Sequence, residues 1–290
     1  MAHATPDRAR SALGAKSPWK ELVVEGVPLA YDDEGRGDPL VCLHAVAHGA
    51  RDFETLRAWM RGTQRVIALD WPGHGNSGDD SAPPTAGRYT ALLARFLDAL
   101  GVERVVLLGN SIGGAAAIRF AAQNPERVRG LVLVDPGGLV RMDAISRLAI
   151  GLMVHFFDAG ARGARWYPSA FKAYYRLVLP LAAAAEQRAR IVACAREMAP
   201  LLAEAWRGFA CPEADLRGMA ESIRCPVLFA WARSDRTLPL ARCREAMLRF
   251  PDARLELFPG GHAPFLECPE LFLPKLEEFL RELRAGEGRG

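Results

Sequence analysis

Short apolar runs alternate with helical runs along most of this chain, and that alternation restricts its fold more than any other feature of the sequence. Six runs of four or five residues are apolar nearly throughout, as in strands buried on both faces of a parallel sheet. These runs are residues 40–43, 66–69, 105–108, 131–134, 227–231 and 255–258. Residues 22–24 and 29–31 read as an N-terminal hairpin. The pattern predicts an α/β fold with a mostly parallel sheet of about eight strands, flanked by helices.

The alternation stops between residues 139 and 212, where the sequence becomes helical and rich in alanine and aromatic residues. A segment inserted after the sixth strand is expected to lie over the carboxyl edge of the sheet as a helical cap. The sequence therefore divides into a disordered leader at 1–18, an α/β core at 19–138 and 213–290, and a cap at 139–212. Most cap aromatics are expected to pack the cap onto the core, and substrate contacts are expected between Leu139 and Phe209.

Charge and composition exclude several classes of protein. The 37 basic and 34 acidic side chains leave a formal charge of +3, which is too small to indicate a nucleic acid partner. No apolar run approaches the ~20 residues of a membrane-spanning helix, and residues 1–18 lack the apolar core of a secretory signal. The six cysteines show no metal-ligand spacing, so buried free thiols in a reducing cytoplasm are expected. The sequence leaves open whether the chain is a monomer or a homo-oligomer.

The sharpest local signal is Gly109-Asn-Ser-Ile-Gly113, which follows the apolar run at 105–108 and precedes a helical stretch at 115–123. A strand, a G-x-S-x-G turn and a helix in this order are the context of a nucleophile elbow. Such a turn holds Ser111 in a strained backbone conformation, and the two glycines prevent Cβ clashes around it. We therefore predict that Ser111 is a catalytic nucleophile. The competing reading is a glycine-rich packing turn.

A serine nucleophile needs a base within hydrogen-bond reach and a group that orients that base. His262 lies in the loop after the last predicted strand, where a base could reach Ser111. Histidines in the leader, in a turn and in the cap fit structural or solvated roles better: His3, His74 and His155. We therefore predict that His262 is the base.

The orienting acid is expected at the end of a strand between the nucleophile and the base. Asp235 follows the run at 227–231, and the chain order serine, aspartate, histidine is the order of this elbow motif. Asp135 also closes a strand and is the rival acid. Asp70 closes a third strand, but the Trp-Pro-Gly that follows it indicates a turn anchor.

Five separated segments together resemble landmarks of the α/β-hydrolase superfamily, specifically its cap-bearing serine hydrolases. They are residues 40–44, the turn Asp70-Trp-Pro-Gly-His-Gly-Asn-Ser77, the elbow at Ser111, the Asp235 loop, and Gly261-His-Ala-Pro-Phe-Leu-Glu267. The resemblance covers nearly all of residues 22–280. It implies the α/β-hydrolase fold, a Ser111, Asp235 and His262 triad, a cap over the site, and neither a metal nor an organic cofactor.

The oxyanion loop departs from the family pattern, because Ala45 follows His44 where the family usually has glycine. The Ile112 amide, at the amino terminus of the helix after Ser111, would face an oxyanion formed on an attacked carbonyl. The resemblance carries the second oxyanion donor over to the amide of Val46. The departure at Ala45 also motivates an alternative reading, a hydrolase-fold ligand-binding protein with little turnover.

Two residues bear on the reaction. Asn110 resembles the Gly-Asn-Ser elbow of meta-cleavage-product hydrolases, which split carbon–carbon bonds, but Ala263 stands where that branch usually has tryptophan. The histidine segment is more similar to that of carboxylesterases. Hydrolysis of a small, mostly apolar ester through an acyl-enzyme is therefore the leading prediction, and carbon–carbon hydrolysis is second.

Residues 73–78 also match the G-x-G-x-x-G dinucleotide fingerprint, which must open directly into a helix. Here two aspartates and a Pro-Pro pair follow it, and these disfavour both a phosphate and a continuous helix. No nucleotide cofactor is predicted.

Overall fold

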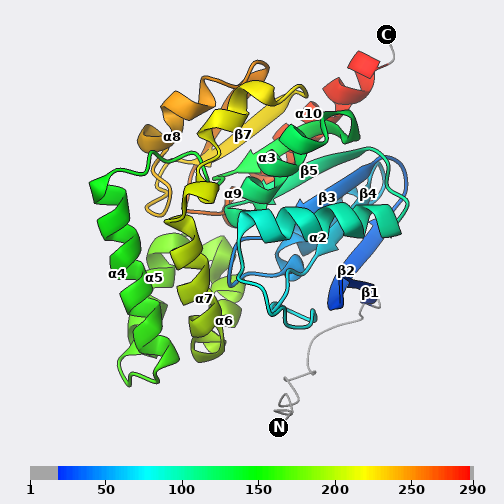
Figure 1. Ribbon diagram of the computed structural model, residues 1–290. Coiled ribbons are helices and arrows are strands. Elements are labelled where there is room, and N and C mark those ends of the chain that lie inside the picture. The colour runs from blue at the N-terminus through cyan, green and yellow to red at the C-terminus, as the bar shows by residue number, and fades with distance from the viewer. Residues whose placement is uncertain (1–18, 288–290) are drawn as a thin grey trace.

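A computed structural model describes residues 19–287, so the predicted leader lies outside the described residues. A single twisted sheet runs between two layers of helices, and a further group of helices extends from one end (Figure 1). The strands are β1 Lys20–Val24, β2 Val27–Gly35, β3 Pro39–Leu43, β4 Arg65–Leu69, β5 Val105–Asn110, β6 Val128–Val134, β7 Val227–Ala232 and β8 Ala253–Phe258. Every predicted strand falls within one of these elements.

The sheet has the order β1-β2-β4-β3-β5-β6-β7-β8. β1 and β2 form an antiparallel hairpin, and β2 also pairs antiparallel with β4. All later pairs, from β4–β3 to β7–β8, are parallel. The carboxyl ends of six parallel strands therefore meet at one edge of the sheet, where loops from distant parts of the chain converge. The predicted α/β-hydrolase fold is confirmed.

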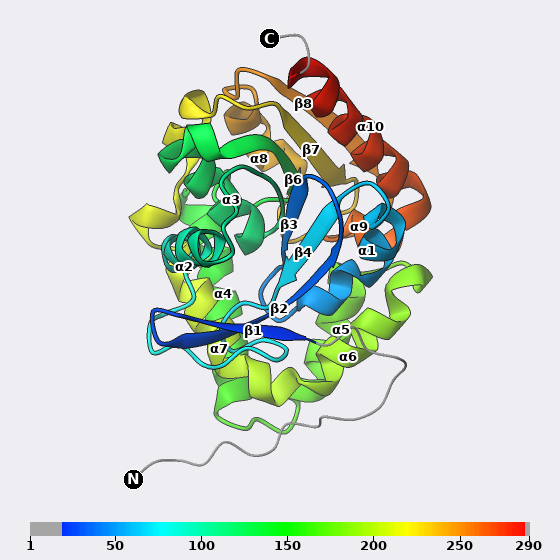
Figure 2. The ribbon, with the colours of Figure 1, turned by 90° about the vertical axis from the view of Figure 1, so that its right-hand side faces the viewer.

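Helices cover both faces of the sheet (Figure 2). One face carries α2 Ala86–Ala99, α3 Ile112–Gln123 and α8 Leu240–Met247, and the other carries α1 Glu54–Met60, the short α9 Pro264–Glu267 and α10 Pro269–Glu287. All residues of β5 and β7 are buried, as predicted. The same prediction is wrong for β8, where Leu255 and Leu257 are 40% and 41% exposed. β8 is an edge strand, and an apolar run does not record its place in the sheet.

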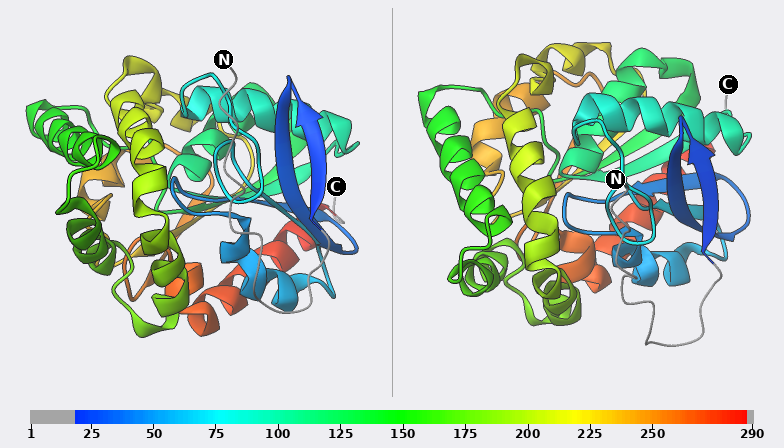
Figure 3. Two further views of the ribbon diagram at one scale, coloured as in Figure 1. Left: turned by 90° about the horizontal axis from the view of Figure 1, so that it is seen from below. Right: turned by 60° about the horizontal axis from the view of Figure 1, so that its bottom comes forward.

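The cap segment between β6 and β7 contains α4 Ala144–Ala161, α5 Tyr167–Val178, α6 Ala185–Ala193 and α7 Ala195–Phe209. In Figures 1 and 3, α4 forms the outer edge of this group and α7 lies between α4 and the core. Most cap aromatics pack inward, as expected, and the buried ones are Phe157, Tyr167, Phe171 and Tyr175. A 3-10 turn, Ala182–Ala184, directly precedes α6.

The expectation that the cysteines are buried needs correction. Four cysteines are buried, but Cys194 is half-buried and Cys211 is exposed, and all six are free thiols. Among the described residues, α4 is long and apolar enough to cross a bilayer by length and composition, although only 22% of it is buried in the fold. Gly151 and His155 interrupt the apolar run in the sequence, so that run is shorter than α4. The helix itself continues through both residues.

Candidate active site

Ser111 is the single residue between β5 and α3. Its φ of 55° and ψ of −117° are strained for a residue with a side chain. A Cβ at Gly109 would lie 2.5 Å from the carbonyl oxygen of Gly113, and a Cβ at Gly113 would lie 2.3 Å from that of Leu43. Both glycines are therefore required by close backbone approach, as the G-x-S-x-G pattern predicts. The first turn of α3 also lies directly against the end of β3.

Two buried histidines hold the loop that follows β3, residues 44–49, which we call the β3 loop. His44 donates from Nδ1 to the Ala45 carbonyl at 2.7 Å and accepts the Trp71 N–H at Nε2 at 2.9 Å. His74 accepts the Ala47 N–H at Nε2, also at 2.9 Å. Burial, reinforced by the neighbouring His74, lowers the pKa of His44 well below its usual range. His44 is therefore neutral, which its acceptor role requires.

Ala45 does not adopt a left-handed backbone conformation. The left-handed backbone lies instead at Ala47, where φ is 65°. Within the described residues, the N–H groups of Val46 and Ile112 donate to no other group. These two N–H groups lie on either side of the contact between Gly113 and the end of β3. Both are therefore available as hydrogen-bond donors beside Ser111.

His262 and Asp235 form a buried hydrogen-bonded pair. His262 Nδ1 donates to Asp235 Oδ2 at 2.7 Å, and the two side chains are 4% and 1% exposed. The other carboxylate oxygen of Asp235 accepts the N–H groups of Thr237 and Leu238 at 2.7 and 3.0 Å. Burial raises the pKa of Asp235, but the His262 partner and the two backbone donors outweigh burial and lower it overall. The pair thus leaves His262 Nε2 as the ring nitrogen open to a third group.

Asn110 joins this pair to the serine turn. Its side-chain nitrogen donates to the His262 carbonyl at 2.9 Å and to the Val134 carbonyl at 3.0 Å. Asn110 directly precedes Ser111 and is fully buried. The structure therefore brings the serine turn and the histidine loop together, although they are 152 positions apart in the chain at this contact.

Asp135, the rival acid, lies in the same cluster without pairing with His262. It follows β6 with a φ of 41°, and its Oδ1 accepts the Ala232 N–H at 2.9 Å. Its Oδ2 has no hydrogen-bond partner among the described residues. Burial and the charge of Asp235 raise the pKa of Asp135 well above its usual value, which favours its neutral carboxylic acid form.

Asp135, Asp235 and His262 also form the one group, within the described part of the chain, whose donor atoms could hold a metal ion. These atoms lie within 4.8 Å of one another. His262 and Asp235 already share a hydrogen bond, so a metal would have to displace its proton. The cluster therefore fits a hydrogen-bonded pair with a neutral neighbour better than a metal centre.

The cap holds the histidine loop through backbone contacts. The His262 N–H donates to the Val178 carbonyl, at the end of α5, at 2.7 Å. Glu267 is 3% exposed and accepts the Leu181 N–H at 2.8 Å and the Gly261 N–H at 2.5 Å. One carboxylate therefore joins the segment after α5 to the residue beside His262. Glu267 is part of the histidine motif in the sequence, but the motif does not predict this role for it.

A second histidine–aspartate pair lies at the end of the β3 loop. His48 Nδ1 contacts Asp52 Oδ2 at 2.5 Å, and Asp52 also pairs with Arg190 of α6. Both side chains of the His48–Asp52 pair are almost fully buried. The sequence prediction missed these residues, although the four-residue spacing of His48 and Asp52 is a readable signal. Their arrangement fixes the end of the β3 loop to the cap.

Asp70 anchors a turn, as predicted. Its two oxygens accept the Ala50 N–H at 2.7 Å and the Asn76 N–H at 3.0 Å, and burial raises its pKa to about 6. The G-x-G-x-x-G segment that follows does not open a helix, because α2 begins only at Ala86. The segment therefore lacks the helix opening that a dinucleotide fingerprint requires.

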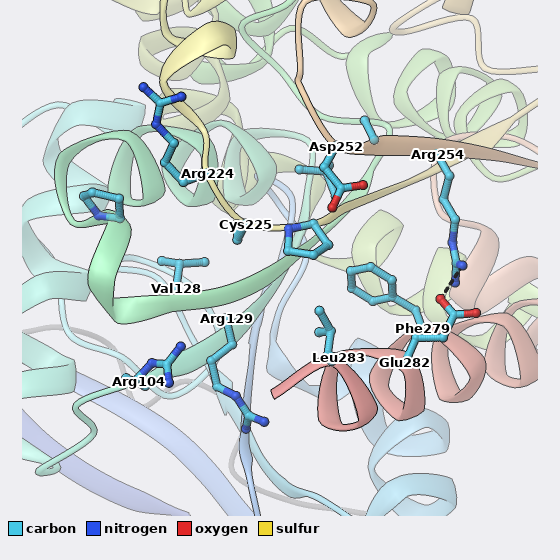
Figure 4. A pocket seen from close by; sticks show the side chains of 15 residues that line it. Arg104, Val128, Arg129, Arg224, Cys225, Asp252, Arg254, Phe279, Glu282 and Leu283 are labelled. Carbon is cyan, nitrogen blue, oxygen red and sulfur yellow. Dashed lines mark hydrogen bonds and ion pairs between the residues drawn. The ribbon is translucent and has the colours of Figure 1, made fainter. Parts of the chain in front are cut away.

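A cavity of about 570 Å³ lies at the opposite edge of the sheet, near the amino ends of β6, β7 and β8 (Figure 4). It contains none of the residues predicted for the site. The guanidinium groups of Arg129 and Arg224 point in opposite directions, and Arg254 is paired with Glu282 (Figure 4). The cavity therefore lacks converging polar groups.

Comparison with known proteins agrees with this architecture. Residues 40–275 match the model of a family described as the alpha/beta hydrolase family. A pimeloyl-[acyl-carrier protein] methyl ester esterase from Nitrosomonas europaea is 32% identical, with 82% of this chain and 94% of that protein covered. A 2-hydroxy-6-oxononadienedioate/2-hydroxy-6-oxononatrienedioate hydrolase from Burkholderia vietnamiensis is 29% identical, with 92% and 96% covered.

Solved structures give the same fold. A thermophilic esterase from Thermogutta terrifontis superposes with a TM-score of 0.76 at 22% identity, with 92% of this chain and 99% of that chain covered. At that identity the likeness concerns the fold alone.

Proposed function

Because this chain belongs to the alpha/beta hydrolase family, we propose that it is a serine hydrolase that cleaves small, mostly apolar esters through an acyl-enzyme. The observation that carries the proposal is the hydrogen bond from the Asn110 side chain to the His262 carbonyl, which joins the serine turn to the histidine loop. On one side Ser111 has a strained backbone at a helix amino terminus, and on the other His262 is oriented by Asp235. A buried packing turn would need neither the strain nor an oriented imidazole.

In the proposed reaction, His262 Nε2 removes the Ser111 hydroxyl proton as the serine oxygen attacks the ester carbonyl. Asp235 keeps the imidazole proton on Nδ1 and stabilises the imidazolium that forms. The N–H groups of Val46 and Ile112 receive the tetrahedral oxyanion, and each such donor contributes about 3 kcal/mol to transition-state stabilisation. His262 then protonates the leaving alcohol, and a water molecule activated by His262 releases the acid.

The cap favours an apolar or aromatic group on the substrate. The Tyr174 side chain, from α5, reaches Thr237 and Asp235, so aromatic residues of the cap approach the proposed triad. We place the reaction in the cytoplasm as part of this proposal, since six free thiols, one of them exposed, suit a reducing compartment.

Carbon–carbon bond hydrolysis is the alternative reaction, and the relative from Burkholderia vietnamiensis supports it. Two observations favour ester hydrolysis. The amide of Asn110 is used to hold the His262 loop, which accounts for this residue without a role toward a dienoic substrate. Ala263 is fully buried where that branch usually carries tryptophan.

A fluorophosphonate probe and short p-nitrophenyl esters test the proposal. We expect rapid labelling of Ser111, identified by mass spectrometry, and ester turnover that falls at least about 10⁴-fold in Ser111→Ala. Ser222→Ala, at an exposed serine of the core, is the matched control and should keep full activity. A protein that resists the probe would instead be a ligand-binding member of the fold. Turnover of a vinylogous diketone but not of any ester would favour carbon–carbon hydrolysis.

A further inference from the structure

An apolar stripe on the outer face of α4 is exposed to solvent. Ile145, Leu148 and Leu152 are 68%, 66% and 63% exposed, and their spacing of three and four residues aligns them along one side of the helix. The ring of Trp166, itself 52% exposed, packs against Phe156 one turn beyond Leu152. The stripe and Trp166 therefore form one apolar face at the outer edge of the cap, which we call the α4 face (Figures 1 and 3).

The unpaired charges around the α4 face are all positive. Its two nearby carboxylates are already paired, Asp143 with Arg242 and Asp158 with Arg207, each at 2.6 Å. The exposed arginines at the ends of α4 and on its surface have no partner among the described residues, and they are Arg141, Arg147, Arg162 and Arg165. An exposed apolar helix with unpaired arginines is complementary to a surface that has an anionic outer layer and an apolar layer beneath it.

The same asymmetry extends over the whole cap. Residues 139–212 carry ten basic and five acidic side chains, so the cap has a net charge of +5 within a chain whose total is +3. If a second copy docked through the same face, two positively charged caps would face each other. Their repulsion disfavours a dimer there. Anionic lipid headgroups would instead attract the cap, by about 1 kcal/mol for each arginine near the surface.

We propose that the α4 face docks the cap onto an anionic lipid bilayer. Ile145, Leu148 and Leu152 enter the boundary between headgroups and acyl chains, Trp166 lies at the headgroup level, and the arginines contact lipid phosphates. α4 lies on the membrane rather than across it, because its opposite side packs against the rest of the cap at Ser146, Phe157 and Gly160. The proposal does not depend on the reaction at Ser111.

Vesicle co-sedimentation tests this docking with the full chain. We expect binding to vesicles that contain phosphatidylglycerol, weak binding to phosphatidylcholine alone, and loss of binding at about 0.5 M salt, where surface charges are screened. Replacing both Leu148 and Leu152 by glutamine should lower the partition coefficient about tenfold or more. The matched control replaces Leu248 and Leu271, which are 78% and 49% exposed on the core, and should bind as the parent does.

A second pair of variants tests the charges. Arg147→Gln and Arg165→Gln should each lower binding to the anionic vesicles about fivefold, whereas Arg224→Gln and Arg281→Gln, at exposed core positions, should not. Thermal unfolding of every variant checks that the fold is retained. Failure of the parent protein to bind anionic vesicles would overturn the proposal. So would a dimer that dissociates when Leu148 and Leu152 are replaced, because a second copy would then cover the α4 face.

Discussion

Asp135 and Asp235 lie in one buried cluster, and their pKa values shift in opposite directions because their partners differ. Asp235 receives three hydrogen bonds, from His262, Thr237 and Leu238, which stabilise its charge. Asp135 receives one, from Ala232, and faces the charge of Asp235 with its other oxygen unpaired. The residue with the charge-stabilising contacts is therefore the one suited to orient His262, and the neutral residue is suited to packing beside it.

This difference predicts the effect of removing each charge. Asp235→Asn should lower the rate of ester hydrolysis about 10⁴-fold, because an amide no longer holds the imidazole proton on Nδ1. Asp135→Asn replaces a neutral acid by a neutral amide of the same shape and should change the rate less than about tenfold. Steady-state kinetics of the two variants compare them directly. A larger loss from Asp135→Asn would reverse the assignment of the two acids.

His44 predicts a pH dependence of stability. A histidine with a lowered pKa in the folded state contributes stability that is present above its unfolded value of about 6.5 and is lost as the pH falls below it. The free energy of unfolding should therefore fall by about 1 kcal/mol between about pH 6.5 and about pH 5.5 from this group alone. Denaturant titrations across this range measure it.

His44→Gln removes the titrating group, so its stability should depend less steeply on pH than that of the parent. His155→Gln, at an exposed position of α4, is the matched control and should keep the parent slope. Parallel pH profiles for the parent and His44→Gln would contradict the burial account of this residue.

At the scale of elements, hydrogen bonds join the cap to the histidine loop. Val178 accepts the His262 N–H, and Glu267 bridges Gly261 and Leu181. A Cβ at Gly261 would lie 2.2 Å from the Val178 carbonyl oxygen, so the two segments are in direct backbone contact. Movement of the end of α5 would therefore move the backbone of His262.

Glu267→Gln tests this connection. The amide can accept from only one of the two N–H groups, so we expect a loss of about 2 kcal/mol in the free energy of unfolding. We also expect kcat to fall more than KM rises, because the His262 backbone loses part of its support. Glu270→Gln, an exposed glutamate at the start of α10, is the matched control and should change neither quantity. Loss of stability with an unchanged kcat would show that Glu267 does not position the base.

Contacts between residues far apart in the chain are the part of the site that could not be predicted from the sequence. Ser111, Asp235 and His262 could be proposed from sequence because each follows a strand with a recognisable local pattern. The Asn110–His262, Arg190–Asp52 and Leu181–Glu267 contacts join residues 152, 138 and 86 positions apart, and no local pattern records them. The exposure of β8 was missed for the same reason, since its place at the edge of the sheet is a tertiary property.

At the scale of the whole molecule, the sheet assembles one site from three distant regions of the chain. β5, β7 and β8 run parallel, so the loops that carry Ser111, Asp235 and His262 leave the same edge. The segment between β6 and β7 contacts loops at that edge, through the Arg190–Asp52 pair and through the Val178 carbonyl, which accepts the His262 N–H. We propose that these separate regions act as a single catalytic unit.

A double-mutant cycle on ester hydrolysis tests that claim most directly. It compares kcat/KM for the parent, Ser111→Ala, His262→Ala and the double variant, all checked for folding by thermal unfolding. If the serine and the histidine act as one unit, either single change should cost about as much as both together, on the order of 10⁴-fold or more. Losses that multiply in the double variant would mean independent roles, and would contradict a Ser111–His262 catalytic unit.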